Sequence, residues 1–264
     1  MKKNLLLRTA VHASAATICK SIHICFIASL LFITNNAAAQ FFPPPRHNPP
    51  PAFTPTASTA QGRQYIKEQI AIHQNCRNVA ITRTNGDLMI HGRNGYACSS
   101  CPQALLNKLK DLNAKNIEIR DVDLTENGSW VVVDGSNNLS WSNVPFGLEQ
   151  KMREFNRNGY LITSVTFNDN GEWIIISTGY FAASSPELQQ KIKDGIAQYG
   201  QIWSACITND ACVIVYERGY KYIGDVPQSL QTALRQTSLN VYRVKIAGTS
   251  WFFADRNGSY QYNM

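Results

Sequence analysis

Apolar and polar residues alternate in short paired runs that recur along most of the chain. The clearest pair occupies residues 162–177, where two alternating runs flank an Asn170-Gly171 turn. Alternation with a period of two indicates a half-buried strand, and Asn-Gly accepts the positive φ angles of a tight hairpin turn. Asn85-Gly86 and Asn127-Gly128 stand at matching places in two further pairs. The pattern therefore predicts a series of β-hairpins.

Each of the first four hairpins is followed by a third short run, a proline and an amphipathic helical pattern. The prolines are Pro102, Pro145, Pro186 and Pro227, which stand at nearly equal intervals. Proline fits the first turn of a helix, because its missing N–H would have no partner there. We therefore predict a repeated strand-strand-strand-helix unit with a period of about 42 residues.

The spacing between each helix and the next hairpin is nearly constant. The interval from a helix core residue to the next inward strand residue is identical in four places: Ile66 to Val79, Leu109 to Val122, Met152 to Val165 and Ile192 to Ala205. The first of these predicts a helix over residues 62–74, which no hairpin precedes. Only the last interval, from Leu234 to Val244, is shorter.

The position of this extra helix suggests how the repeats are joined. The chain stops at Met264, where the spacing of the earlier units would place a fifth proline and helix. The helix at 62–74 can complete that last unit, so the array can close and needs no polar end caps. We predict an α+β fold of five strand-strand-strand-helix units over residues 62–264, closed into a five-fold α/β propeller-like ring. An open array is the alternative.

Five such units resemble the α/β propellers of the pentein type, in which small mixed sheets surround a pseudo-five-fold axis with helices outside. The repeat motif, G-x-W followed by Val or Ile and later Pro-x-x-Leu, is similar to tandem repeats of exported bacterial proteins of unassigned function. The pentein resemblance implies one possible activity, a cysteine hydrolase with histidine and acidic partners. The repeats contain only His73 and His91, neither in a nucleophile or metal motif, and a fold by analogy does not carry a function.

Residues 1–39 are typical of an export signal. They have a basic start, an apolar run over residues 24–33 and Ala37-Ala38-Ala39 before Gln40. We predict cleavage after Ala39, a secreted, periplasmic or cell-surface location, and no transmembrane span after signal removal. An uncleaved membrane anchor is the alternative. Residues 40–61 are rich in proline and are predicted to form an extended linker.

The net charge of +7 first suggests a nucleic-acid partner, but its distribution does not support one. Four of the 25 basic residues lie in the predicted signal, which has no acidic residue, so the rest of the chain has nearly balanced charges. A basic surface large enough to neutralise many phosphates is not expected from this balance. We predict no nucleic-acid binding.

Signal removal leaves five cysteines, an odd number, so one unpaired thiol is expected. Cys98 and Cys101 form a CxxC motif at a helix start, which we interpret as a structural disulfide, with Cys76 as a possible replacement for either partner. A redox pair is the alternative. Cys206 and Cys212 flank a short turn and are predicted to bond across it, although a buried free thiol at Cys212 is also possible.

Aromatic residues on the third runs and arginines in matching turns suggest a binding face. Such a face suits a sugar or a protein, and arginines can hold an anionic ligand bidentately. The candidate binding residues are Arg93, Tyr96, Trp141, Tyr180, Arg218, Tyr220, Arg256 and Tyr260. Packing between units and solvated turns are the alternatives.

The sequence shows no phosphate-cradling loop, zinc-spaced Cys/His set or Ser/His/Asp pattern. We therefore predict no catalytic residue, metal or cofactor. The favoured function is an exported non-enzymatic binding or scaffold module for an unknown protein or glycan partner. The alternatives are a periplasmic thiol-disulfide active protein that uses Cys98 and Cys101, and a pentein-like cysteine hydrolase.

Overall fold

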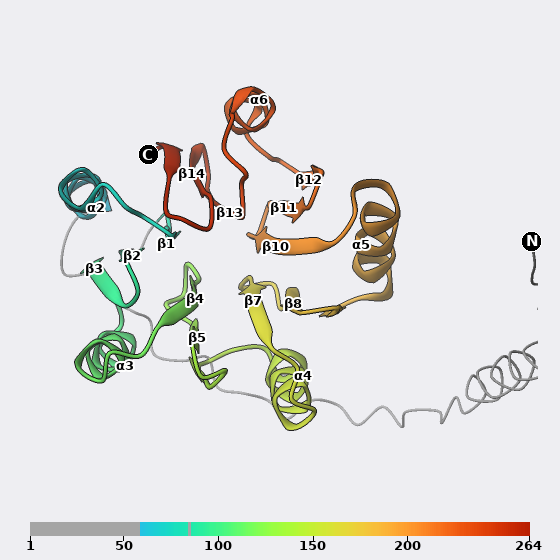
Figure 1. The fold of residues 1–264 in the computed structure, drawn as a ribbon, viewed down its shortest axis with the longest axis horizontal. Coiled ribbons are helices and arrows are strands. Elements are labelled where there is room, and N and C mark those ends of the chain that lie inside the picture. The colour runs from blue at the N-terminus through green and yellow to red at the C-terminus, as the bar shows by residue number, and fades with distance from the viewer. Residues whose placement is uncertain (1–58, 84–85) are drawn as a thin grey trace, which may run out of the picture. The chain divides into compact units, whose positions relative to one another are not determined.

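The computed structural model of the chain describes residues 59–83 and 86–264. The predicted signal peptide and most of the predicted linker lie outside these residues. The described part is an α+β structure in which five three-stranded antiparallel sheets alternate with helices (Figure 1). This is the predicted order of strand, strand, strand and helix.

The helices are α2 (Thr59–His73), α3 (Gln103–Ala114), α4 (Phe146–Arg157), α5 (Pro186–Tyr199) and α6 (Gln228–Gln236). The first two sheets contain β1 (Asn78–Ala80), β2 (Asp87–His91), β3 (Gly95–Ser99), β4 (Ile119–Leu124), β5 (Trp130–Asp134) and β6 (Leu139–Ser142). The third contains β7 (Ile162–Phe167), β8 (Trp173–Ser177) and β9 (Tyr180–Ala183). The last two contain β10 (Ile202–Ile207), β11 (Ala211–Tyr216), β12 (Gly219–Gly224), β13 (Arg243–Ala247), β14 (Ser250–Ala254) and β15 (Tyr260–Asn263).

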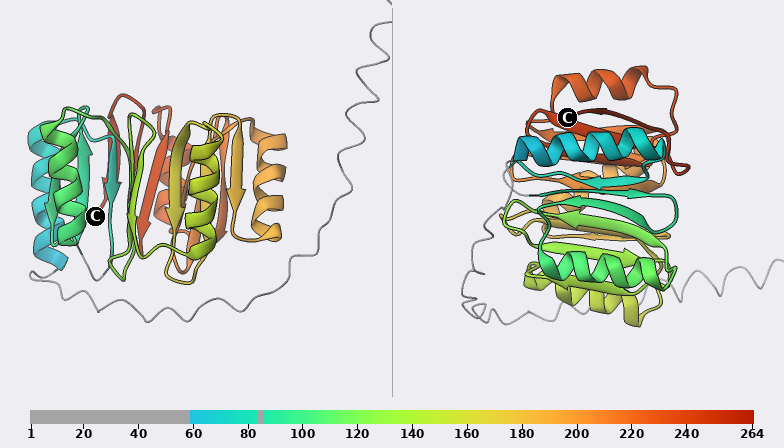
Figure 2. Two further views of the ribbon diagram at one scale, coloured as in Figure 1. Left: turned by 90° about the horizontal axis from the view of Figure 1, so that it is seen from below. Right: turned by 90° about the vertical axis from the view of Figure 1, so that its left-hand side faces the viewer.

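The first strand of each sheet lies innermost and the helices lie outside. Figure 1 shows β1, β4, β7, β10 and β13 around a common centre. Strands and helices lie nearly along one common axis (Figure 2), so the loops gather at the two ends of the described part. The second strand is central in each sheet, so the third strand is the outer edge.

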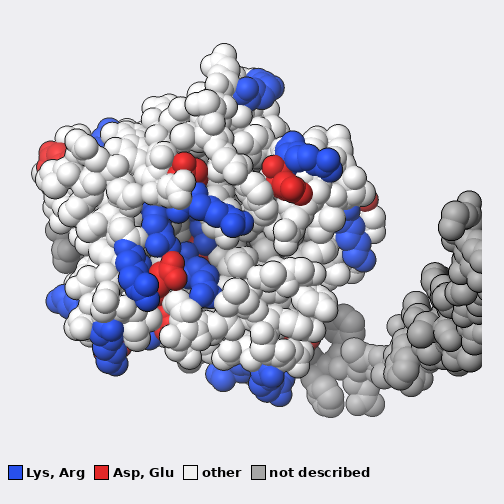
Figure 3. Space-filling view, in the orientation of Figure 1, with Lys and Arg blue, Asp and Glu red and all other residues white. Residues whose placement is uncertain are grey.

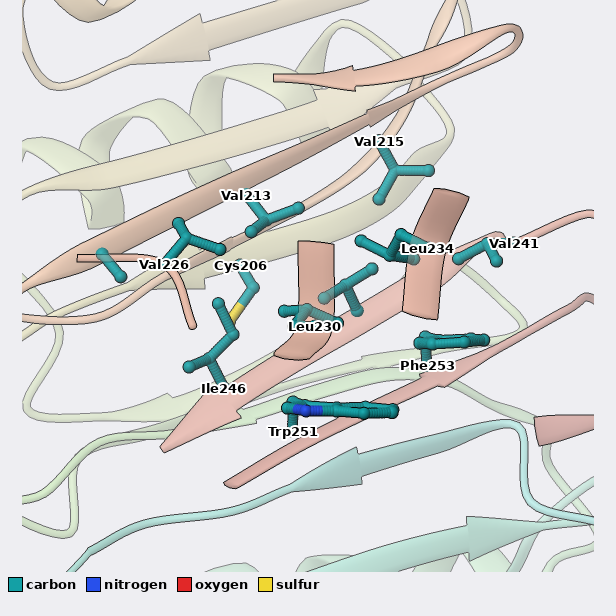
Figure 4. Packing of buried hydrophobic residues seen from close by; sticks show 12 residues of the cluster. Cys206, Val213, Val215, Val226, Leu230, Leu234, Val241, Ile246, Trp251 and Phe253 are labelled. Atoms are coloured by element: carbon teal, nitrogen blue, oxygen red, sulfur yellow. The ribbon is translucent and has the colours of Figure 1, made fainter. Parts of the chain in front are cut away.

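Separate hydrophobic clusters hold each helix between two neighbouring sheets. Figure 4 shows one of them, in which Val213 and Val215 of β11 lie near Leu230 and Leu234 of α6, with Phe253 of β14 on the other side. Burial of such side chains is the main favourable term in folding. The clusters therefore make every sheet depend on two helices.

The helix without a preceding hairpin, α2, lies between the last sheet and the first. Ile66 and Ile70 of α2 are fully buried, and their cluster contains Val79 of β1 together with Phe252 and Ala254 of β14. The helix predicted from the spacing thus covers the strands that end the chain, as expected. It begins at Thr59, slightly before the predicted start at Gly62.

The predicted register also agrees with the burial of the side chains. The paired residues are all buried: Ile66, Val79, Leu109, Val122, Met152, Val165, Ile192 and Ala205. The shorter interval from Leu234 to Val244 has a structural cause, because α6 has 9 residues whereas α5 has 14. The glycines of two predicted Asn-Gly turns have the expected positive φ, 78° at Gly128 and 86° at Gly171.

Candidate functional site

Buried side chains, most of them polar, fill the space where the five first strands meet. When these strands are aligned on Val79 and its equivalents, the residues one position before and one position after form two rows, which point to the face opposite to that of the aligned residue. The first row is Asn78, Asp121, Ser164, Ser204 and Arg243, and the second is Ala80, Asp123, Thr166, Cys206 and Lys245. Buried polar groups are costly unless they are hydrogen-bonded. Their partners therefore decide how the units are joined.

Side chains of these rows accept hydrogen bonds from backbone N–H groups at the unpaired edges of neighbouring first strands. Such an edge carries backbone N–H groups with no partner in its own sheet. Asp121 accepts a hydrogen bond from the N–H of Val165 at 2.9 Å. The hydroxyl of Thr166 accepts one from the N–H of Ile207 at 3.1 Å. Adjacent units are thus joined by side chains, because their sheets are separate.

Two buried ion pairs connect the second unit with the fifth. Arg243 lies 3.1 Å from Asp121, and Lys245 donates to Asp123. Arg243 also donates to the carbonyl of Thr163 at 2.7 Å. Burial disfavours the ammonium of Lys245, but the carboxylates of Asp123 and Asp121 outweigh that effect and raise its pKa. Lys245 therefore remains charged at neutral pH.

A cavity of about 520 Å³ opens at the end where the first strands begin. Its charged lining residues are Arg77, Glu118, Arg120, Arg243, Asp255 and Arg256. Figure 3 shows basic side chains gathered at the middle of this face, with acidic ones among them. Trp203, Tyr242 and Leu161 add aromatic and apolar surface. The cavity thus combines a positive charge excess with flat apolar surfaces.

β-bulges help to place three of the lining residues. The pairing of the first and second strands shifts at the same place in the second, third and fourth sheets, which leaves Arg120, Thr163 and Trp203 unpaired. A bulge bends its strand and redirects the side chain of the extra residue. All three residues line the cavity.

Two of the cavity arginines have carboxylate partners. Arg77 lies 2.9 Å from Glu118, and Arg243 is paired with Asp121 as described above. The guanidinium of Arg77 also donates to the carbonyl of Gly92 at 3.0 Å. These two arginines are therefore fixed and largely neutralised.

The other two arginines have no such partner. Arg120 donates to the carbonyls of Gly135 at 2.7 Å and Ile162 at 3.2 Å. The guanidinium carbon of Arg256 lies 4.4 Å from the ring centre of Tyr242, an attractive cation–π distance. Within residues 59–83 and 86–264, neither Arg120 nor Arg256 forms an ion pair. The cavity therefore holds two guanidinium groups that lack a carboxylate.

Asn78 stands beside these arginines and has a buried acceptor without a partner in the described part of the chain. The residue lines the cavity and is only 2% exposed. Its Nδ2 donates to Oδ1 of Asp121 at 2.8 Å. Because a carboxylate only accepts, this contact fixes the amide orientation and turns Oδ1 of Asn78 away from Asp121. That Oδ1 has no hydrogen-bond partner among the described residues.

The structure brings only one of the eight predicted binding residues, Arg256, to this cavity. The third strands are outer strands, so their aromatic residues are distributed around the outside of the described part (Figure 1). Four of them are half-buried and pack against four different hydrophobic clusters: Tyr96, Trp141, Tyr220 and Tyr260. Packing between units, the alternative stated above, accounts for these four.

The remaining three predicted residues are exposed and lie outside the cavity. Arg93 and Arg218 occupy turns between second and third strands, the same kind of turn that carries Arg256. Tyr180 is 54% exposed and stacks on Tyr160, with ring centres 4.3 Å apart. Only the turn of the last sheet places its arginine in the cavity.

Sequence reasoning missed most of the residues that line the cavity. The signal that identifies them is the repeat itself. Two residues before each aligned buried residue stand Arg77, Arg120, Thr163, Trp203 and Tyr242. This row of polar and aromatic side chains becomes visible when the units are aligned on their first strands and not only on their third strands.

The cysteines follow the prediction in one place and contradict it in another. The sulfur atoms of Cys98 and Cys101 are joined in a disulfide next to the start of α3. The expected bond between Cys206 and Cys212 is absent, and both thiols are free and buried.

The register of the hairpin explains the missing bond. Cys206 lies opposite Val213, and Cys212 lies opposite Ile207. Because successive side chains of a strand point to opposite faces, the two thiols face opposite sides of the sheet. They accordingly belong to different hydrophobic clusters. The alternative of a buried free thiol at Cys212 is the correct one.

The free thiols give a direct prediction for the chain that begins at residue 40. Burial raises the pKa of Cys76 to about 12 and that of Cys206 to about 11, so neither forms the reactive thiolate at neutral pH. We expect no thiol of the native protein to react with Ellman's reagent at pH 8, and three to react after unfolding in guanidinium chloride. We also expect no insulin reduction. Insulin reduction that is lost in Cys98→Ser would support the thiol-disulfide alternative.

The histidines do not contribute to the cavity. His73 and His91 stack on each other with ring centres 3.6 Å apart. Burial and the neighbouring His73 lower the pKa of His91. Neither residue lines the cavity, so the lining contains no general base of the kind that the hydrolase alternative requires.

Comparison with known proteins gives no further identification. No family model matches the sequence, and no curated protein is significantly similar to it. In the described part of the chain, no group of His, Cys, Asp and Glu is arranged to hold a metal ion, and no helix is long and apolar enough to cross a membrane. Functional inference therefore rests on the cavity.

Proposed function

We propose that the five units form a closed ring of the α/β propeller type and that the protein is an exported, non-enzymatic binding module. Its ligand is an anion held in the axial cavity. The successive hydrophobic clusters support the ring, because each joins two neighbouring sheets and the cluster of α2 joins the last sheet to the first. The basic and apolar pattern of residues 1–39 supports export.

The observation that carries the proposed ligand class is the pair of arginines without carboxylate partners. A guanidinium group is a planar array of donors that matches a carboxylate or phosphate. Arg120 and Arg256 reach the same recess, where nearby low-dielectric walls strengthen the attraction for an anion. The cavity volume of about 520 Å³ lies within the range of small-ligand sites.

The buried carboxylates favour binding over catalysis. Asp121 and Asp123 already accept hydrogen bonds from backbone N–H groups, and each is paired with a cation of the fifth unit. A carboxylate held in this way is a structural group and is not available as a base. The charges that remain available in the cavity are those of the arginines.

Titration calorimetry with inorganic phosphate and with citrate tests the proposal, on the chain from residue 40. We expect binding that weakens as salt is added. Arg256→Gln should weaken it about 10- to 100-fold, the usual effect of losing a charged hydrogen bond. Arg120→Gln should do the same.

Arg218→Gln is the matched control, because Arg218 occupies the equivalent turn but lies outside the cavity. It should bind as the unmodified chain does. Absence of phosphate and citrate binding at millimolar concentration, or an equal loss in Arg218→Gln, would contradict the proposed function. Thermal melts of each variant separate a binding defect from a folding defect.

A further inference from the structure

A groove of about 700 Å³ lies on the outer surface between β6 and α4. β6 contributes Leu139 and Trp141 to its lining, and α4 contributes Gln150, Arg153 and Arg157. These three helix positions are three and four residues apart, so they share one face of the helix. None of the groove residues lines the axial cavity. The groove is therefore a separate surface feature.

One side of the groove is the edge of the second sheet. The turn before β6 is closed by a hydrogen bond from the N–H of Asp134 to the carbonyl of Asn138. Hydrogen-bonded and non-hydrogen-bonded pairs alternate along an antiparallel ladder, so Ser140 is bonded to β5 through its backbone. The backbone groups of Leu139 and Trp141 then point away from the sheet. Such an edge can accept a further strand.

The corresponding edge of the third sheet is partly covered. Ala183 of β9 is equivalent to Trp141, because each is paired with the second residue of the preceding strand. Nε2 of Gln189, the fourth residue of α5, donates to the carbonyl of Ala183 at 3.1 Å. The fourth residue of α4 is Glu149, a carboxylate that cannot donate and that accepts from Arg153 at 2.8 Å. The edge of β6 is therefore the more accessible of the two.

The helix side of the groove is basic. Arg153 and Arg157 line it together with one acid, Glu154, which is paired with Lys151 at 2.6 Å. Within residues 59–83 and 86–264, Arg157 forms no ion pair. The guanidinium carbon of Arg153 lies 5.0 Å from the ring centre of Trp141, above the strand edge. The groove thus combines a free strand edge with positive charge.

We propose that this groove binds an extended segment of a partner protein with acidic side chains at alternate positions. The segment adds to β6 as a fourth strand, and it is antiparallel because that pairing is the more stable one. Residues directly opposite each other in such a pair share a face of the sheet. The acidic side chains therefore point to α4, where Arg153 and Arg157 can bind them. This interaction does not depend on the anion of the axial cavity.

Three blocked peptides test the charge of the partner. The first is acetyl-TETVTET-amide, whose glutamates and valine share one face when it is extended. In the other two, both glutamates are replaced by glutamine or by lysine. We expect the glutamate peptide to bind the chain from residue 40 about tenfold more tightly than the glutamine peptide, the effect of a charged hydrogen bond. Calorimetry measures the affinities.

Two results with these peptides would overturn the proposal. One is the absence of binding by the glutamate peptide at about 1 mM, a concentration that detects weak complexes. The other is binding of the lysine peptide that is as tight as that of the glutamate peptide. A partner recognised by its negative charge is expected to give neither result.

Backbone methylation tests the pairing with the strand. A peptide residue opposite Trp141 directs its side chain to α4 and its N–H to β6. Methylation of the glutamate and valine nitrogens should therefore abolish binding. Methylation of the threonine nitrogens, which point away from β6, is the matched control and should preserve binding. Equal affinities of the two methylated peptides, or loss only in the threonine-methylated one, would overturn the pairing.

Arg157→Gln tests the contact with the helix. We expect this variant to bind the glutamate peptide about tenfold more weakly and the glutamine peptide unchanged. Arg235→Gln is the matched control, because Arg235 lies in the last turn of α6 as Arg157 does in α4, but outside the groove. An equal loss in both variants would overturn the role of Arg157.

Sedimentation of the chain with and without the glutamate peptide tests the identity of the occupant. We expect a monomer whose mass increases only by that of the peptide. A dimer that the peptide dissociates would mean that a second copy of the chain occupies the edge of β6. That result would overturn the proposal of an acidic partner segment.

Discussion

Replacing Ile70 with alanine is expected to lower the free energy of unfolding by about 2–5 kcal/mol, the usual cost of truncating a buried aliphatic side chain. Ile70 is fully buried in the cluster that α2 shares with β1 and β14. Guanidinium chloride unfolding followed by circular dichroism measures the change. Ile72→Ala is the matched control on the same helix, because Ile72 is 67% exposed. It should change the stability by no more than about 0.5 kcal/mol.

Deleting residues 59–74 tests the proposed closed ring more severely. The deletion removes Ile66 and Ile70 and exposes apolar surface of the first and last sheets together, including Val79 and Phe252. We expect the shortened chain to lose its cooperative unfolding transition. If it melts at the same temperature as the intact chain, the proposed closure is wrong.

The second large effect is expected at Asp121. Asp121→Ala should lower the free energy of unfolding by about 3–5 kcal/mol, because it leaves a buried cation without its partner. Arg243 would lose its carboxylate, and the N–H of Val165 would lose its acceptor. Denaturant unfolding again provides the measurement.

A surface ion pair supplies the control for this variant. Asp111 and Lys115 lie 2.7 Å apart at the exposed C-terminal end of α3. Asp111→Ala should cost at most about 1 kcal/mol, since exposed pairs contribute little. A comparable loss in both variants would contradict a special role of the central network.

A double variant separates the ion pair from the backbone contact. Replacing both Asp121 and Arg243, with alanine and methionine, removes the unpaired charge but not the unsatisfied N–H of Val165. We expect the double variant to be more stable than Asp121→Ala alone, so the two substitutions will not be additive. Additive losses would mean that the pair itself contributes nothing.

The local architecture was accessible from the sequence because its determinants are short-range. Turn residues such as Asn170-Gly171, the prolines before the helices and the constant spacing represented by Ile66 and Val79 each act within one unit. They define the strands, the helices and their register. The prediction of α2 as the partner of the last strands followed from the same counting.

The buried polar residues between the five first strands could not be predicted from the sequence in the same way. Alternation along β4 shows that Asp121 and Asp123 share one face of the strand, but not that this face is buried. Both residues are buried because four other first strands approach from separate units. The predicted bond between Cys206 and Cys212 failed for a related reason, since a single step in register decides whether two side chains meet. The candidate site depends on the first of these facts and was therefore mostly missed.

The division of one structural unit between α2 and the last sheet has a consequence for biosynthesis. A polypeptide that emerges N-terminus first carries Ile66 and Ile70 long before their partners Phe252 and Ala254 are made. The apolar face of α2 is then without its partners, and accessible to chaperones or to self-association, until synthesis of these last strands is finished. We therefore expect the packing of α2 to be completed late, after β14 has been synthesised.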